Sequence, residues 1–413
     1  MSDVVIVGAG LAGLACALRL QEAGVDFTLV EAADRVGGRV RTDSERGYLF
    51  DRGFQVFLTS YPEARRLLDY DALELRYFES GATVFCDGEF HPLVDPWRHP
   101  AACLSCLFSP VGSFADKLRI ARLRSRVCRG SLDAVLALPE KTTAEALAED
   151  GFTEEMVEVF FRPFLGGIFL ERELVTSSRK FHWLFRMFSK GRVAVPARGM
   201  QQIPLQLAGR LPPEKLMFNA RVARVMPGRV SLEDGRDLLC RQIVIATDPA
   251  TAVQLFDGLP RPAFRAVTNL YYSLDEVPMK GATLLLNGSG RGLLNNLVFI
   301  TEASEHYAPK GRVLASAVVL GDPQLDDHLL DCAVREQLVE WFGMSVGAWK
   351  LEKIYRIREA LPDQPAGSLA VPVRPARLQD WLVVAGDWRG IASINGALES
   401  GRLAAEAVLE KVL

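Results

Sequence analysis

An apolar run that leads directly into three patterned glycines constrains the fold of this chain more than any other stretch. Residues 4–7 read Val-Val-Ile-Val, and the next six are Gly8-Ala9-Gly10-Leu11-Ala12-Gly13. An apolar, helix-like segment then runs to residue 23, and a second apolar run ends at Glu31. This order, with an acid about 20 residues beyond the glycines, predicts a strand–turn–helix–strand unit that binds a dinucleotide.

Each part of this unit has a physical role. Gly8 allows the turn out of the strand, Gly10 lets the backbone approach a pyrophosphate, and Gly13 permits close packing of helix on sheet. The helix N-terminus presents free N–H groups to the phosphates. The Glu31 carboxylate can accept hydrogen bonds from a ribose diol. It would repel a 2′-phosphate, which argues against NADP as the cofactor. A glycine turn without a ligand is the less favoured alternative, because strand, helix and acid all match.

The residues that follow the acid distinguish one dinucleotide from another. They read Glu31-Ala32-Ala33-Asp34-Arg35-Val36-Gly37-Gly38-Arg39-Val40-Arg41-Thr42. This run resembles the pattern E-A-x-x-R-x-G-G-R-x-x-T of the flavin-containing amine oxidase, protoporphyrinogen oxidase and carotenoid (phytoene) desaturase superfamily. The resemblance implies that FAD is the cofactor and that Gly37, Gly38 and Arg39 lie along its pyrophosphate and flavin. An arginine at this position can neutralise the negative charge of a phosphate through a bidentate contact.

Further cofactor residues follow from the same resemblance. The segment around Gly53 is expected to close over the flavin, a valine of a later strand to contact adenine, and the C-terminal strand and helix to hold the ribityl phosphate and flavin edge. The predicted cofactor-binding residues are Gly8, Ala9, Gly10, Leu11, Ala12, Gly13, Glu31, Ala32, Gly37, Gly38, Arg39, Gly53, Phe54, Gln55, Val222, Ala246, Gly386, Asp387, Ser393, Ile394 and Ala397.

Cofactor motifs at both ends of the chain imply a discontinuous cofactor domain. The predicted fold class is α/β (α+β overall), with a Rossmann-like FAD-binding domain of the glutathione-reductase type and an interleaved substrate domain of antiparallel sheet plus helices. Residues 1–58, 196–258 and 363–413 are assigned to the FAD-binding domain. Residues 59–195 and 259–362 are assigned to the substrate-binding domain, with its helical part at about 100–190.

Composition narrows the classes of partner. The chain has 413 residues with 48 basic and 51 acidic side chains, so its net charge of −3 argues against nucleic acid. The hydrophobic share of 49% fits a large buried core together with an apolar substrate channel or a membrane-contacting patch. Residues 4–18 are too short and too glycine-rich for a membrane span or export signal, which predicts a cytoplasmic protein. A basic amphipathic helix at residues 108–130 leaves peripheral membrane contact open, although a solvated helix is favoured.

Cysteines and histidines give no sign of a metal site. The seven cysteines are scattered, and Cys103 and Cys106 form a CxxC spacing without a second pair. We interpret them as reduced, mostly buried thiols. The five histidines do not occur at ligand spacing, so no metal is predicted.

Two aromatic-rich segments stand in the middle of the chain, at residues 160–170 and 181–188. Such helices can line a cavity for a flat or long apolar molecule, or they can be plain core. The resemblance places the substrate cavity in this region and therefore favours the cavity.

The predicted function is that of an FAD-dependent oxidoreductase in which the flavin carries the chemistry, so no catalytic residue is assigned. Amine oxidases of the superfamily place a lysine on the strand that returns to the substrate domain and an aromatic residue before the last helix. Residues 266–272 here contain no lysine, and Ser393 takes the second position. These departures, with the stretches around Leu361 and Asp387, favour a desaturase-like enzyme that abstracts hydride from an apolar, isoprenoid-type substrate.

Three other expectations complete this reading. The electron acceptor is expected to be a quinone or oxygen. An amine or protoporphyrinogen oxidase is the first alternative. The second is a non-catalytic binding protein of the same fold, as in the Rab escort and GDP-dissociation inhibitor proteins, which the intact glycine motif disfavours.

Overall fold

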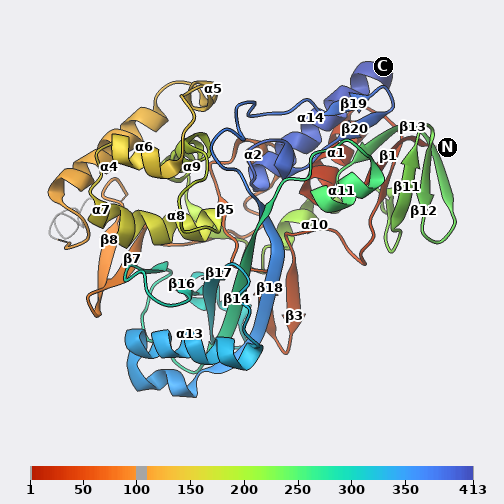
Figure 1. Ribbon diagram of the computed structural model, residues 1–413. Coiled ribbons are helices and arrows are strands. Elements are labelled where there is room, and N and C mark those ends of the chain that lie inside the picture. The colour runs from red at the N-terminus through yellow and green to blue at the C-terminus, as the bar shows by residue number, and fades with distance from the viewer. Residues whose placement is uncertain (1, 99–108, 413) are drawn as a thin grey trace.

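The computed structural model describes residues 2–98 and 109–412, and it contains two large β-sheets that lie apart from one another (Figure 1). Both chain ends lie beside the first sheet (Figure 1). The predicted Cys103–Cys106 spacing and the start of the predicted helix at residue 108 fall outside the described residues. No helix within the described ranges is both long and apolar enough to cross a membrane.

The first sheet has eight strands and forms around the apolar run at the N-terminus. Its central strand β1 pairs in parallel with β2 on one side and β13 on the other, and β20 pairs in parallel with β13. The strands are β1 (Ser2–Val7), β2 (Phe27–Val30), β10 (Leu216–Met217), β11 (Val222–Met226), β12 (Arg229–Leu232), β13 (Asp237–Ile245), β19 (Arg377–Gln379) and β20 (Leu382–Val384). Strands from three distant parts of the chain thus meet in one parallel core, which is the expected site for a dinucleotide.

Two long helices pack beside each other against this sheet (Figure 1). They are α1 (Leu11–Glu22), which the glycine turn opens, and α14 (Ile394–Val412), which ends the chain. A Cβ added at Gly401 would lie 2.1 Å from the Ala12 carbonyl oxygen, so only glycine permits this approach. The first and last cofactor motifs are therefore brought together by helix packing.

The second sheet has seven strands in the order β18-β14-β17-β16-β15-β7-β8. All neighbours are antiparallel except β15 and β7. The strands are β7 (Gly81–Cys86), β8 (Glu89–Val94), β14 (Phe264–Leu274), β15 (Leu285–Asn287), β16 (Leu294–Phe299), β17 (Val313–Leu320) and β18 (Lys350–Pro362). Helix α13 (Asp327–Phe342) covers one face with Leu330, Val334 and Leu338 (Figure 1).

The remaining helices gather mainly into a separate group beside the second sheet (Figure 1). Its members are α4 (Phe114–Cys128), α5 (Leu132–Leu136), α6 (Thr143–Glu149), α7 (Glu154–Met156), a π-helical turn at Val157–Phe161, α8 (Arg162–Phe169) and α9 (Ser178–Lys190). Two small sheets join the parts: β3 (Thr42–Glu45) with β4 (Tyr48–Asp51), and β5 (Phe57–Leu58) with β9 (Val193–Val195) and β6 (Arg76–Tyr77). Short helices α2 (Pro62–Leu67), α10 (Gln202–Ala208), α11 (Pro249–Leu255) and α12 (Ile300–Ala303) complete the connections.

The predicted fold class is confirmed, but the longest strand of the second sheet was not predicted. Strand β18 spans thirteen residues, and the sequence analysis did not predict it. Its residues mix charged and apolar types without a strict alternation, and most of them are half-buried. Its partner in the sheet, β14, lies about 90 residues earlier in the chain. The domain boundaries given above stay a prediction.

Candidate cofactor and substrate site

A cavity of about 1490 Å³ runs between the two sheets and the helical group. Every residue predicted to bind the cofactor lines it except Ala9 and Gly13. Those two act from behind the wall: the Ala9 N–H donates to the Glu31 carboxylate, and Gly13 packs the helix onto the sheet. The structure thus brings the predicted residues from both ends of the chain around one space.

The glycine turn has the geometry that a pyrophosphate cradle needs. Gly8 has a φ of +105°, and a Cβ on Gly13 would lie 1.9 Å from the Gly8 carbonyl oxygen. Gly10 differs, because a Cβ added there meets no atom within 4 Å and would project into the cavity. Gly8 and Gly13 therefore serve the fold, whereas Gly10 leaves space for a ligand.

Glu31 holds the loops around this cradle. One carboxylate oxygen accepts the Ala9 N–H at 2.7 Å and the other accepts the Ala33 N–H at 2.9 Å. The Gly37 N–H in turn donates to the Ala9 carbonyl at 2.9 Å. The Glu31 carboxylate also faces the cavity, and its remaining lone pairs can accept hydrogen bonds from hydroxyl groups.

Arg39 makes an ion pair that the sequence did not predict. Its Nη2 donates to Asp387 Oδ1 at 2.5 Å, and its Nη1 donates to the Ala360 carbonyl at 3.2 Å. Asp387 had been predicted only as a cofactor contact. The pair joins the N-terminal and C-terminal motifs across the cavity, and phosphate binding by Arg39 stays a prediction.

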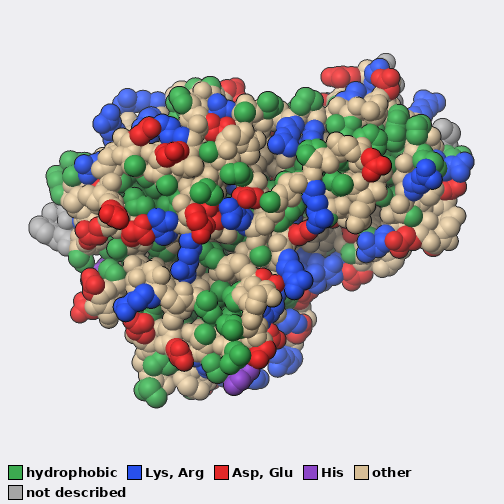
Figure 2. Space-filling view, viewed as in Figure 1, with side chains coloured by type: hydrophobic (Ala, Val, Ile, Leu, Met, Phe, Trp, Pro, Cys, Tyr) green, Lys and Arg blue, Asp and Glu red, His purple; other side chains and the backbone are tan. Residues whose placement is uncertain are grey.

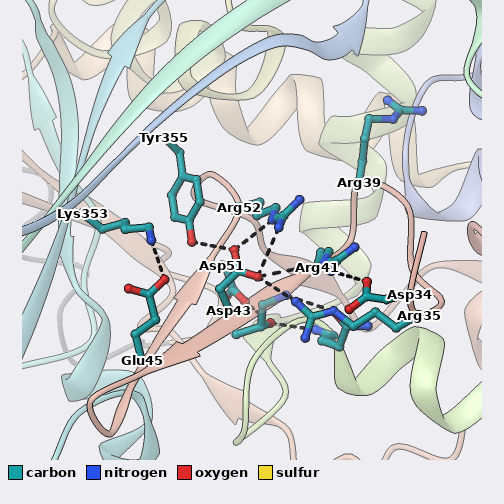
Figure 3. Close-up of polar contacts among 12 residues, drawn as sticks. Asp34, Arg35, Arg39, Arg41, Asp43, Glu45, Asp51, Arg52, Lys353 and Tyr355 are labelled. Carbon is teal, nitrogen blue, oxygen red and sulfur yellow. Dashed lines mark hydrogen bonds and ion pairs between the residues drawn. The ribbon is translucent and has the colours of Figure 1, made fainter. Parts of the chain in front are cut away.

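A second charge cluster, centred on Asp43, stands at the same wall, and its members Arg52 and Tyr355 line the cavity (Figure 3). Asp43 accepts from Arg35 at 2.7 Å, from Arg52 at 2.9 Å and from the Tyr355 hydroxyl at 2.8 Å. Burial alone would raise the pKa of Asp43, but the hydrogen bonds from Arg52 and Tyr355 lower it below its usual range. The hydrogen bond from Tyr355 to Asp43 ties the hairpin β3–β4 to strand β18.

The aromatic-rich segments divide between cavity and core according to helical periodicity. Phe161, Phe169 and Phe181 are fully buried in the core. The other face of the same helices opens onto the cavity with Phe160, Phe164, Ile168, Trp183, Leu184, Phe185 and Phe188. Phe160 and Phe164 stack at 5.4 Å, which gives this end of the cavity a flat aromatic wall. The sequence left open whether these segments line a cavity or belong to the core. One face of each helix does the first and the other face does the second.

A group of charged side chains lines the cavity near the end of α9. Four are basic, Arg98, Lys117, Arg124 and Arg192, and two are acidic, Glu79 and Asp95. Arg98 donates to the Gly191 and Phe188 carbonyls, and Arg124 lies 3.1 Å from Asp95. We call these six residues the basic rim. The charge pattern of this region was not evident in the sequence, because the six residues come from four separate segments.

Lys180 on α9 also lines the cavity and was missed by the sequence analysis. Only 4% of the Lys180 surface is exposed to solvent, and its Nζ lies 5.6 Å from the centre of the Phe169 ring. Burial lowers the pKa of this amine to about 8. In the sequence it stood beside the second aromatic segment and resembled any helix-surface lysine.

The residues present fit an FAD molecule. The cradle has open space above Gly10 and a carboxylate at Glu31. Helix α14 begins at Ile394 beside the same cavity, and its Gly396 N–H donates to the Ser393 hydroxyl at 2.9 Å. Val222 and Ala246 also line this part of the cavity. These groups match the donors and acceptors that a dinucleotide offers. The aromatic end of the same cavity leaves room for a substrate.

Comparisons with known proteins agree with this geometry. A family model described as flavin containing amine oxidoreductase matches residues 11–409. Coproporphyrinogen III oxidase of Mycobacterium tuberculosis is 26% identical over 98% of this chain and 97% of its own length. A lycopene-forming phytoene desaturase of Paracoccus sp. is 53% identical, but over only 12% of this chain and 10% of its own length.

A solved structure shows the same fold. Cyclohexylamine oxidase from Brevibacterium oxydans superposes with a TM-score of 0.71 at 20% identity, covering 100% of this chain and 99% of that one. The family match over nearly the whole chain, together with the cradle and its companion motifs, leads to one conclusion. The chain belongs to the flavin-containing amine oxidoreductase family and is an FAD-dependent oxidoreductase.

Proposed function

We propose that this enzyme oxidises a large, mainly apolar substrate that carries acidic groups, of the porphyrinogen class. The basic rim beside the aromatic wall is the observation that supports the proposal. Four basic and two acidic side chains of the rim line the same cavity as Phe164 and Phe188. An apolar ring system with carboxylate arms would place its rings on the aromatic wall and its arms at the rim.

The same rim argues against the other substrate classes considered. A cationic amine would meet an excess of positive charge, and the lysine and aromatic residue typical of amine oxidases are absent at residues 266–272 and at Ser393. A hydrocarbon polyene gains nothing from desolvating basic side chains. The full-length similarity to a coproporphyrinogen III oxidase supports the porphyrinogen class further.

Each part of the chain then has a defined task. FAD, when bound, supplies the acceptor for a hydride. Gly10, Glu31 and the N-terminus of α14 hold and orient it, and the Arg39–Asp387 pair keeps the two halves of the cradle together. Trp183 and Leu184 keep water from the reacting carbon because they form an apolar wall.

The test is anaerobic mixing of the flavin-loaded protein with coproporphyrinogen III, protoporphyrinogen IX, a polyene precursor and an amine. We expect the flavin absorption to bleach fastest with the porphyrinogen that has more carboxylates. Substitution of Arg192 by Gln should raise the KM for that porphyrinogen and leave the flavin content unchanged. Bleaching by an amine alone would overturn the proposal.

Desaturation of an isoprenoid-type substrate is the second candidate. The observation in its favour is the apolar lining deep in the cavity, where aromatic and aliphatic side chains from α8 and α9 predominate. Bleaching by the polyene precursor, insensitive to Arg192→Gln, would make this the function in place of porphyrinogen oxidation.

A further inference from the structure

Lys180 is a buried amine that faces the cavity without an ion pair or hydrogen bond among the described residues. It projects from the first turn of α9 beside Trp183 and Leu184, which line the same wall. Its Nζ lies over the face of the Phe169 ring, 5.6 Å from the ring centre. A buried ammonium normally has a carboxylate partner, because burying an unpaired charge is costly.

The carboxylates near Lys180 are already engaged elsewhere. Glu171, after α8, accepts from Thr176, and one of its oxygens lies 3.8 Å from Arg265 on β14. Asp363, at the end of β18, pairs with Arg265 at 3.0 Å. The third carboxylate, Asp387, pairs with Arg39. Arg179 on the same helix donates to backbone carbonyls. Each acid thus has an arginine nearby, and the Lys180 amine is left facing the cavity.

Two physical effects favour the neutral form of this amine. Burial among apolar side chains disfavours the ammonium, and the first turn of a helix carries a partial positive charge. Burial is the larger influence and lowers the pKa of Lys180 to about 8, although Asp387, Asp363 and Glu171 oppose it. At neutral to mildly alkaline pH, a fraction of the amine is therefore ready to accept a proton.

The oxidation that this family performs releases such a proton. When a single bond becomes a C=C or C=N bond, one hydrogen leaves with both bonding electrons and the other leaves as a proton. The charge of Asp387, on the side of the cavity that holds the predicted cofactor residues, raises the pKa of Lys180, and Lys180 lines the same cavity as Trp183 at the aromatic end. A substrate lying on the aromatic wall would therefore pass close to this amine.

We infer that Lys180 is the catalytic base, whose Nζ accepts the proton that the substrate loses as its hydride passes to the oxidised flavin. The neutral amine becomes an ammonium, the substrate gains one double bond, and the electron pair reduces the flavin. The inference rests on the proposed function only for the substrate used in the assay, because every oxidation considered above releases the same proton.

The experiment compares Lys180→Met, Lys180→Arg and the control Lys190→Met, all loaded with FAD. Lys190 lies at the exposed end of the same helix. Anaerobic flavin reduction by the best substrate of the panel is followed across pH. We expect the parent rate to rise to a plateau above about pH 8, and Lys180→Met to lose about 100-fold together with this pH dependence. Small primary amines should restore part of the Lys180→Met rate.

The arginine variant separates a base from a docking charge. Arginine keeps the positive charge but does not release its proton, so Lys180→Arg should be as slow as Lys180→Met. A fast Lys180→Arg enzyme would overturn the inference and assign an anion-docking role to this position. So would a Lys180→Met enzyme that keeps the parent pH profile.

A second measurement does not depend on turnover. Lysines labelled by ¹³C reductive methylation are titrated by NMR in the flavin-loaded protein, with Lys180→Met identifying the signal. A midpoint near 8 supports the inference, and a midpoint at the ordinary lysine value overturns it. Failure of the proposed function would appear differently, as no bleaching of the parent enzyme by porphyrinogens.

Discussion

The two ends of the cavity differ in how completely their polar groups are paired. The end of the cavity lined by the predicted cofactor residues is the cofactor end. There Glu31 accepts hydrogen bonds from two backbone N–H groups, and Arg39 pairs with Asp387. Asp43 accepts hydrogen bonds from two arginines and a tyrosine. At the aromatic end, Lys180 of α9 has no ion pair among the described residues. The buried His182 of the same helix does not line the cavity, and within the described ranges neither of its ring nitrogens has a hydrogen-bond partner.

This difference reflects what each end must do. A cofactor site holds one molecule in one geometry, so its polar groups are fixed in advance by hydrogen bonds. A substrate site gains from groups whose partner arrives with the substrate, because such groups can change protonation or bind only then. Outside the cavity, acidic and basic side chains are interspersed over the face shown in Figure 2.

The largest effect is expected from Gly10→Val, which tests the cofactor end. A Cβ at this position meets no protein atom within 4 Å but projects into the cavity, so the variant should fold and purify without flavin. The absorption spectrum and the far-UV circular dichroism of the purified protein check both parts. Gly347→Val, at an exposed site with equal free space, should keep its flavin. A yellow Gly10→Val protein would contradict the assignment of the cradle.

The next effect concerns His182, a buried residue of α9 that does not line the cavity. Burial lowers the pKa of His182 to about 4, whereas an unfolded histidine has a pKa of about 6.5. Between these values the unfolded chain binds a proton that the folded chain does not, so stability falls as pH decreases, by about 2 kcal/mol at pH 5.

Replacing His182 by Phe should remove that contribution. The loss of Tm between pH 7.5 and pH 5 should be smaller in His182→Phe than in the parent protein, and unchanged in His328→Gln, which alters an exposed histidine. Equal losses of Tm in all three proteins would mean that His182 is not held neutral.

A smaller effect is expected from Glu31→Ala, which removes the acceptor of the Ala9 and Ala33 N–H groups. Losing a charged hydrogen-bond acceptor costs about 1.5 kcal/mol, which corresponds to roughly tenfold weaker FAD binding. Flavin fluorescence titration of the apoprotein measures this, with Glu410→Ala as the exposed control. FAD affinity equal to that of the parent would show that Glu31 serves only the protein.

The smallest effect is expected from Phe164→Ala at the aromatic wall. Removing a ring that stacks on Phe160 should cost about 1 kcal/mol of substrate binding, or about fivefold in KM, with flavin content unchanged. Phe114→Ala, which removes an exposed ring outside the cavity, is the control. A loss of flavin in Phe164→Ala would break the division of the cavity into two ends.

Much of the cofactor end was predictable from sequence. A glycine turn, an acid at a fixed distance and a helix N-terminus act through the backbone and through local spacing, so their positions can be read along the chain. All of the predicted cofactor residues except Ala9 and Gly13 line the cavity. The Arg39–Asp387 pair was not predicted, because the two residues are far apart in sequence and each had been assigned to the ligand.

The aromatic end depended on tertiary structure. The sequence showed aromatic segments at residues 160–170 and 181–188 but not which face of each helix is turned inward. It also did not reveal β18, whose half-buried residues lack a strict alternation and whose strand partner, β14, lies about 90 residues earlier in the chain.

The sequence by itself therefore determined the cofactor, the family resemblance and the fold class, because these depend on local backbone geometry that a few glycines and one acid impose. Only the tertiary structure decided the substrate side. Within the part of the chain that the structure describes, it left Lys180 without an ion pair or hydrogen bond. It also brought the basic rim together from four segments and placed both beside the aromatic wall. Burial and charge balance arise from packing between distant segments, and no local pattern encodes them.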